Sequence, residues 1–235
     1  MPALSVLSCD PFALTIKTIT LVTVAIVVLT SETYVRARVP SHQQSKFYAL
    51  LLFSTLPMCL LGSTTDLIMI VLAFYFLSVT SYILTGYLRD DRRSVEAAIK
   101  YFLYGATLSA VMLYGVSWFY GLTGSTDLTE IATALLESES RLRPVLLPAL
   151  IFVAAGLAFR IGAVPFHQWA PDAYEGAPTP ISAFLSVGPT ITGLAVVLRV
   201  LLTGLPVELE EVATDWRALL MALSTLTMTV GNLAA

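Results

Sequence analysis

The sequence predicts an all-α protein that crosses a membrane several times, and three observations support this prediction. First, 57% of the 235 residues are hydrophobic and only 12% are charged, whereas a soluble globular domain carries about 25% charged residues. Second, the hydrophobic residues gather in blocks of about 20 residues, the length of a membrane-spanning helix. Third, the blocks are continuous, whereas the strands of a membrane β-barrel would alternate between apolar and polar residues.

Seven blocks are expected to span the membrane, one of them as a broken helix. They are Phe12–Leu29, Phe47–Leu61, Leu67–Tyr87, Ala97–Tyr120, Val145–Phe166, Ile181–Leu202 and Trp216–Ala234. Pro57 predicts a kink in the second block, because proline lacks the backbone donor of a helix interior. We expect one transmembrane domain over residues 1–235, in which residues 1–11 form a short extension and residues 12–235 hold the helices. The extension lacks the basic residues of a cleavable signal peptide.

Basic residues in the connections predict the orientation of the spans. The first and third connections and the start of the fourth span hold Arg36, Arg38, Lys46, Arg89, Arg92, Arg93 and Lys100. The opposite connections are rich in carboxylates. By the positive-inside rule, the basic side faces the cytoplasm or its organellar equivalent. We therefore expect Arg36, Arg89, Arg92 and His167 on one side of the membrane, and Asp127 and Glu210 on the other.

The remaining composition limits the chemistry of this chain. Cys9 and Cys59 form neither a disulfide framework nor a metal-binding spacing, and His42 and His167 are too few for a histidine-rich metal site. The sequence has no glycine-rich nucleotide loop, so any nucleotide chemistry is expected on another chain. A net charge of −3 without a basic stripe gives no indication of nucleic-acid binding.

The stretch FRIGAVPFHQWAPDAYEGAPTP, from Phe159 to Pro180, predicts a broken helix. Its four prolines cannot all lie in one continuous helix, so we expect an interruption between about Gly162 and Pro180. Broken helices at membrane depth typically line ion-binding cavities, although an interfacial turn would have the same composition. The residues assigned to this motif are Pro165, Trp169, Pro171, Asp172, Tyr174, Glu175, Gly176 and Pro178.

Arg160 lies about 15 residues into its span, or roughly 22 Å along a helix. An arginine at that depth costs at least ~2.5–3.5 kcal/mol, and intramembrane charges usually mark ion or proton paths. The alternative is that its side chain extends to the interface near His167. His167 is either a hydrogen-bonded structural residue or a proton shuttle, because an imidazole pKa near ~6.5 allows both roles.

Lys100 follows the charged segment YLRDDRRSV, in which Ser94 can cap the next helix and Glu96 favours its N-terminal end. Lys100 is expected at the edge of the hydrocarbon region. Its charge serves either to orient the span or to assist transport.

Several segments resemble one family of membrane proteins. The segments SYILTGYLRDDRRSVEAAIKYFLYGA, MLYGVSWFYGLTGSTDL, GLAFRIGAVPFHQWAPDAYEGAPTPISAFLSVGP and GNLAA are similar to antiporter-like subunit 2 of complex I and its photosynthetic relatives. Complex I is the proton-pumping NADH:quinone oxidoreductase. The similarity is close from about Asp66 to Ala235 and looser before. It implies roughly half of a fourteen-helix fold built from two inverted repeats.

The resemblance also implies a proton path with three altered positions. In the family, a glutamate pairs with a lysine before the broken helix, and a second lysine lies on the next helix. This sequence has Tyr75, Arg160 and Thr190 at these positions, and Lys100 and His167 are further candidates. Burial lets a lysine lose its proton, but arginine stays protonated. We therefore expect the half-channel of this chain to be impaired or silent.

The resemblance implies a membrane-arm subunit of an assembly that passes electrons from NADH or ferredoxin to quinone and translocates protons. NADH, flavin, iron–sulfur clusters and quinone would bind to partner subunits, so this chain would hold no cofactor. Expected partners are other membrane-arm subunits, lipids and either a separate chain with the second half or the rest of a longer chain. Two alternatives stay open: a non-pumping structural scaffold, and a subunit of a related cation/proton antiporter or membrane-bound hydrogenase.

The expected location is a multi-pass protein of a bacterial plasma membrane or mitochondrial inner membrane, in preference to a thylakoid. Near the end of the last span, Asn232 and two small alanines favour close helix contact. We therefore expect a partner chain on Trp216–Ala234.

Overall fold

The structure is a computed structural model that describes residues 6–137, 143–205 and 210–234. The elements in order are α1 (Pro11–Arg38), α2 (Ser41–Phe53), α3 (Thr55–Ser63), α4 (Leu67–Thr85), α5 (Arg92–Thr123), α6 (Leu128–Glu137), α7 (Arg143–Arg160), α8 (Trp169–Gly176), α9 (Thr179–Arg199), the π-helix η2 (Val200–Gly204) and α10 (Glu210–Ala234). Apart from two isolated β-bridges, the regular structure of these residues is helical. The all-α prediction is confirmed.

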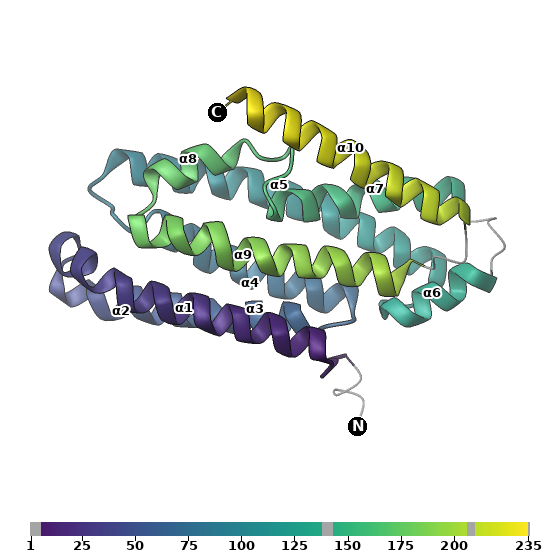
Figure 1. Cartoon of the computed structure of the whole chain (residues 1–235), viewed down its shortest axis with the longest axis horizontal. Helices are drawn as coiled ribbons and strands as arrows, with labels where there is room; N and C mark the ends of the chain where they lie inside the picture. Colours follow the sequence, from purple (N-terminus) through teal and green to yellow (C-terminus); the bar gives the residue numbers. More distant parts are fainter. Residues whose placement is uncertain (1–5, 138–142, 206–209, 235) are drawn as a thin grey trace.

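The long helices lie side by side along one direction, as in a bundle that crosses a membrane (Figure 1). Helices α4 and α9 lie in the middle, where 56% of the most apolar window of each is buried, against 28% for α1. The outer helices instead expose large apolar side chains such as Leu29 and Leu103. In a membrane these side chains meet lipid, so their exposure has no hydrophobic cost.

Five of the seven predicted spans correspond to helices that are long and apolar enough to cross a membrane. These are Pro11–Arg38, Ser41–Ser63, Leu67–Thr85, Arg92–Thr123 and Thr179–Gly204. The fifth predicted span is a shorter apolar helix that ends at Arg160, before the predicted end at Phe166. The seventh is α10, which has 25 residues but begins with charged turns. The chain is therefore a multi-pass membrane protein with one short and one partly polar helix.

The kink predicted at Pro57 appears as a division of the second span into α2 and α3. Proline at this position cannot donate a hydrogen bond to the carbonyl of Phe53, four residues earlier. The division falls at Ser54, whose hydroxyl donates to the carbonyl of Leu51 at 2.6 Å.

Aspartates, and not the predicted serine, cap the N-termini of three long helices. Asp10, Asp66 and Asp91 accept backbone hydrogen bonds of 2.7, 2.9 and 2.9 Å at the starts of α1, α4 and α5. Ser94 lies inside α5, and its hydroxyl donates to the carbonyl of Thr85 at 2.7 Å. The prediction of a Ser94 cap is wrong because the stronger signal, Asp91, comes three residues earlier.

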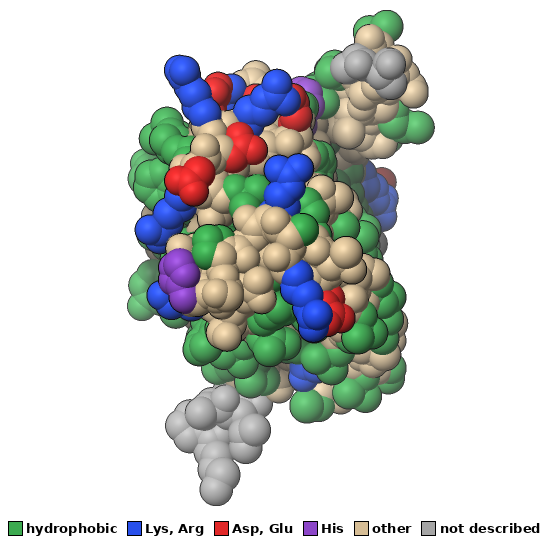
Figure 2. Space-filling view, turned by 90° about the vertical axis from the view of Figure 1, so that its left-hand side faces the viewer, with side chains coloured by type: hydrophobic (Ala, Val, Ile, Leu, Met, Phe, Trp, Pro, Cys, Tyr) green, Lys and Arg blue, Asp and Glu red, His purple; other side chains and the backbone are tan. Residues whose placement is uncertain are grey.

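The connections gather at two opposite ends of the bundle. At one end, the hydroxyl of Tyr87 after α4 donates to the carbonyl of Gln43 in α2 at 2.7 Å. At the other end, Leu67 and Thr126 share a backbone hydrogen bond of 2.9 Å. The first end, called the basic end below, comprises the α1–α2 and α4–α5 connections and α8. Figure 2 shows Lys and Arg side chains gathered on it.

This arrangement agrees with the predicted separation of charges. Arg36, Arg89 and Arg92 belong to the basic end. At the other end, Asp127 directly precedes α6 and Glu210 begins α10 (Figure 1). Which side of the membrane the basic end faces stays a prediction.

Candidate functional site

The predicted interruption of the helix is confirmed. Helix α7 ends at Arg160, residues 161–168 form turns, and α8 and α9 follow. Gly162 has a φ of 68°, a left-handed conformation that glycine adopts without steric cost. The amide of Ala163 donates to the carbonyl of Ala158 at 2.8 Å, which closes the end of α7 in the manner of a Schellman motif.

The four prolines occupy places that need no backbone donor. Pro165 lies in the turns, and Pro171 lies in the first turn of α8. Pro178 precedes α9, and Pro180 lies in its first turn. The amides of a helix's first turn have no partner within the helix. The four prolines therefore interrupt the helix without removing a hydrogen bond from a helix interior.

Trp169 joins the two halves of the broken helix. Its ring stacks on Tyr101 of α5, with centroids 4.4 Å apart and an interplanar angle of 13°. Its indole N–H donates to the carbonyl of Phe159, near the end of α7, at 3.1 Å. At the far end of α8, a Cβ added to Gly176 would lie 2.6 Å from the carbonyl oxygen of Arg93. Helix α8 is thus fixed against α5 along its length.

Ion pairs also join α5 and α8 on the exposed side of their interface. The amino group of Lys100 lies 3.0 Å from Asp172 Oδ1 and 3.0 Å from Glu96 Oε1. Arg93 pairs with Glu175 at 3.5 Å. The Lys100 and Asp172 side chains are 40% and 43% exposed. Lys100 therefore positions α8 on α5 in this structure, and a transport role for it stays a prediction.

The turns of the break lie beside α5, away from its first turns. The hydroxyl of Tyr104 donates to Gln168 Oε1 at 2.7 Å. Tyr104 is twelve residues from the start of α5 at Arg92, which is about 18 Å along a helix. His167 precedes Gln168 and is half-buried in the same turns.

Arg160 is buried, with 5% of its surface exposed. Its guanidinium donates to the carbonyl of Phe74 at 3.2 Å, to the hydroxyl of Ser78 and to that of Ser109 at 3.5 Å. The guanidinium carbon lies 4.9 Å from the ring centroid of Phe74 and 5.4 Å from that of Phe159. Among the described residues, no carboxylate is within ion-pair distance.

These contacts exclude the interpretation that Arg160 extends to the interface. Its side chain points between α4 and α5, and α9 closes the site behind it. A Cβ added to Gly193 of α9 would lie 3.2 Å from the Cβ of Arg160 and 3.1 Å from the side chain of Ile161. The positive charge is therefore held inside the protein by neutral dipoles and aromatic faces.

Tyr75 and Thr190 do not form a hydrogen-bonded chain with Arg160. Tyr75 follows Phe74 on α4 and is half-buried, and none of its described contacts is a hydrogen bond to the guanidinium. The hydroxyl of Thr190 donates to the carbonyl of Leu185 in its own helix at 3.1 Å. Pro189 has no N–H to offer that carbonyl, so Thr190 takes its place.

His167 carries a buried ring nitrogen, Nδ1, without a hydrogen-bond partner among the described residues. The structural role predicted for a hydrogen-bonded imidazole is therefore unsupported at this atom. Its role as a proton shuttle stays a prediction.

Arg199 is a second buried arginine, for which the sequence predicted no site. It forms two hydrogen bonds with the carboxylate of Asp10, at 3.0 and 3.1 Å, and a third with the carbonyl of Gly62 at 3.1 Å. Hydrogen bonds from Arg199 lower the pKa of the Asp10 carboxyl to about 2. The signal was present, because Arg199 lies inside an apolar block as Arg160 does, but its partner is 189 residues away.

Residues 64–235 match the family described as NADH:quinone oxidoreductase/Mrp antiporter, TM. The chain belongs to this family. It is 43% identical over 226 residues to NADH-quinone oxidoreductase subunit N 2 of Rhizobium meliloti (strain 1021), covering 96% of this chain and 45% of that protein. It is 43% identical over 227 residues to NAD(P)H-quinone oxidoreductase subunit 2 of Microcystis aeruginosa (strain NIES-843), covering 96% and 43%.

Among solved structures, the chain resembles one in respiratory complex I from Thermus thermophilus with bound aureothin. The TM-score is 0.75 at 32% identity, and the match covers 96% of this chain and 45% of the other. The chain thus spans less than half the length of the relatives it matches. The resemblance to the antiporter-like subunit 2 family, and to about half of its fold, is confirmed.

Proposed function

We propose that this chain forms part of the membrane arm of a complex I-type assembly, and that its own Tyr75, Arg160 and Thr190 positions do not relay protons. Its relatives are named as subunits of quinone oxidoreductases, which supports the first half of the proposal. The environment of Arg160 supports the second half. In this proposal the chain is a subunit of the enzyme without a catalytic centre, and NADH, flavin, iron–sulfur clusters and quinone are bound by partner subunits.

The observation that carries the proposal is a guanidinium surrounded by neutral groups. A relay needs a site whose protonation changes near the working pH. Arginine keeps its proton in proteins. Thr190 and Tyr75 supply no charge that could change the protonation of Arg160. The hydroxyl of Thr190 also donates a hydrogen bond within its own helix. A fixed positive charge also opposes the passage of cations through a narrow path.

Partner subunits and a second half of the fold belong to the same proposal. Helix α10 exposes Met221, Met228 and Leu233, at 64%, 66% and 82%. We propose that this helix contacts the second half, on the same or a separate polypeptide. A test of this proposal is to purify the chain from its native membrane. Copurification of flavin- and iron–sulfur-containing subunits would support a complex I-type assembly over a free cation/proton antiporter.

The decisive measurement is the number of protons translocated per electron pair by the assembled complex in sealed vesicles. For Arg160→Ala we expect a lower yield of assembled complex and an unchanged ratio. The double variant Arg160→Lys with Tyr75→Glu restores two family residues and is expected to keep or raise the ratio. A fully assembled Arg160→Ala complex with a reduced ratio contradicts the silent path. An unchanged ratio in both variants agrees with the silent path, whereas a ratio abolished by the double variant contradicts it.

A further inference from the structure

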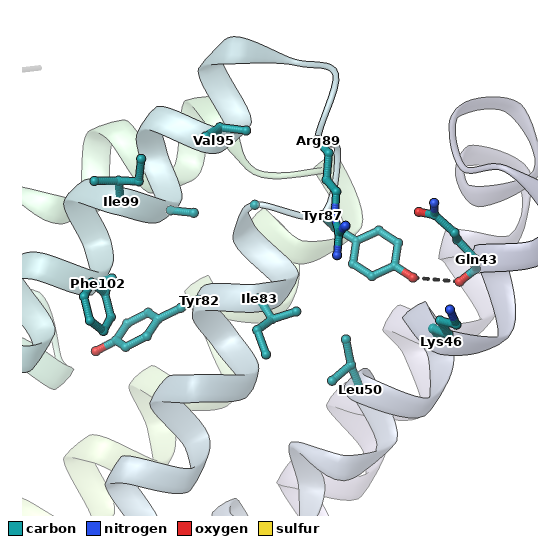
Figure 3. A pocket seen from close by; sticks show the side chains of 12 residues that line it. Gln43, Lys46, Leu50, Tyr82, Ile83, Tyr87, Arg89, Val95, Ile99 and Phe102 are labelled. Atoms are coloured by element: carbon teal, nitrogen blue, oxygen red, sulfur yellow. Dashed lines mark hydrogen bonds between the residues drawn. The ribbon is translucent and has the colours of Figure 1, made fainter.

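A groove lies at the basic end between α2 and α5, with α4 as its floor (Figure 3). Its volume is about 470 Å³, within the roughly 300–1,000 Å³ of typical small-ligand sites. Leu50 of α2, Ile83 of α4 and Val95, Ile99 and Phe102 of α5 give it apolar walls. Four of these five side chains are exposed: Ile83, Val95, Ile99 and Phe102, at 46%, 36%, 54% and 52%.

The walls of the groove are held at a fixed spacing. The Tyr87 hydroxyl donates to the carbonyl of Gln43 at 2.7 Å, which ties the end of α4 to α2 (Figure 3). The Tyr87 ring also meets the fully buried Phe47 edge-on, with centroids 5.2 Å apart. On the other wall, a Cβ added to Gly86 would lie 2.7 Å from the Cβ of Ala98, so α4 and α5 touch there. The groove is thus preformed.

Two cations stand at the polar end of this groove. Lys46 of α2 and Arg89 of the α4–α5 connection belong to its lining, and no carboxylate does among the described residues. Neither cation forms an ion pair with a described residue. Figure 3 shows both beside the Tyr87 ring, with the apolar Leu50 and Ile83 further along the groove. Positive charge at the surface and apolar walls below it match the two ends of a phospholipid.

We propose that this groove binds an anionic glycerophospholipid, with its phosphate between Lys46 and Arg89 and an acyl chain along Ile83, Ile99 and Phe102. Basic pockets between helices are recognised sites for anionic headgroups. A neighbouring apolar helix is the alternative occupant. It fits less well, because covering the groove with apolar side chains would bury two cations without a counter-charge.

The proposal is tested by native mass spectrometry of the purified full chain, loaded with phosphatidylglycerol or with phosphatidylcholine of the same acyl chains. We expect selective retention of phosphatidylglycerol. The variant Lys46→Gln with Arg89→Gln should weaken this retention about thirtyfold, or about 2 kcal/mol, since each basic residue near an anionic lipid contributes about 1 kcal/mol. The matched control Arg36→Gln with Arg92→Gln removes two charges from the same end outside the groove and should change retention less than threefold.

Two further variants separate binding from misfolding. Lys46→Arg with Arg89→Lys keeps both charges and should retain the lipid. Ile99→Trp keeps both cations and fills the apolar part, so it should release the lipid without altering the melting temperature in detergent. Equal losses from the groove pair and the control pair overturn the proposal, and so does equal retention of the two lipids. A polypeptide that cross-links to the Ile99→Cys variant in the native membrane, with no lipid retained, identifies a helix as the occupant instead.

Discussion

Arg160 and Arg199 are both buried arginines in apolar helices, but they are compensated in different ways. Arg199 lies where α9 gives way to η2 and holds the carboxylate of Asp10 with two hydrogen bonds. Arg160 lies between α4 and α5, and its described partners are a carbonyl, two hydroxyls and two aromatic rings. Burial alone therefore does not define the role of a charged side chain. A paired arginine joins elements, whereas an unpaired one places net charge inside the protein.

The largest expected effect comes from removing the counter-charge of Arg199. Asp10→Ala leaves a guanidinium that is 7% exposed without its carboxylate. Removing one partner of a buried pair typically costs about 3–5 kcal/mol, and we expect about 2–4 kcal/mol here because solvent reaches Asp10. Thermal unfolding in detergent measures the loss. Glu32→Ala breaks the exposed Arg36–Glu32 pair and serves as the control. A loss no greater than that of the control contradicts the difference drawn between the two arginines.

The second prediction contrasts two substitutions at Arg160. Arg160→Ala removes a large buried side chain, and we expect a loss of about 2–4 kcal/mol from the cavity. Arg160→Met fills much of the same space without a charge. An apolar replacement of a buried charge is often neutral or stabilising, so we expect a change within about 1 kcal/mol. Arg199→Met, by contrast, leaves the carboxylate of Asp10 without its arginine partner and should be destabilising. If Arg160→Met unfolds the protein as readily as Arg199→Met does, the two sites are alike in energy.

The smallest effect concerns pH. The pKa of Asp10 is lowered to about 2 in the folded protein by Arg199, from about 3.9 in an unfolded chain. A lowered carboxyl pKa stabilises the fold above the unfolded value, and this contribution is lost as the pH falls from about 4 to 2. We expect about 1 kcal/mol after allowance for solvent screening of a carboxylate that is 38% exposed. Unfolding measured across this range should show the loss in the native chain and less of it in Asp10→Asn. Identical pH profiles would count against the pairing.

The sequence predicts the break at α7 well because its causes are local. Pro165 and Pro171 cannot continue a helix, and a glycine at position 162 permits the left-handed turn. The kink near Pro57 was predictable for the same reason. Helix α6 was missed because it has only ten residues and follows a polar connection. The π-helix η2 depends on backbone geometry that residue types alone do not specify.

The partners of the buried groups were harder to predict. The sequence shows that Arg160 must face protein or water, but not that Ser78 and Ser109 would meet it from two other helices. The pair of Asp10 and Arg199 and the groove between α2 and α5 likewise depend on how distant helices pack. Such contacts join residues that are far apart in the sequence, so the hydrophobic pattern of a single segment does not predict them.

The stacked rings of Trp169 and Tyr101 have a mechanical consequence. The backbone between Arg160 and Trp169 is a series of turns, yet the indole ring bridges it by holding the carbonyl of Phe159. A displacement of α8 would therefore be passed through the Trp169 ring to Phe159, the residue before Arg160. These contacts bypass the turns of the break, so α8, the end of α7 and the adjoining part of α5 are expected to move as one unit.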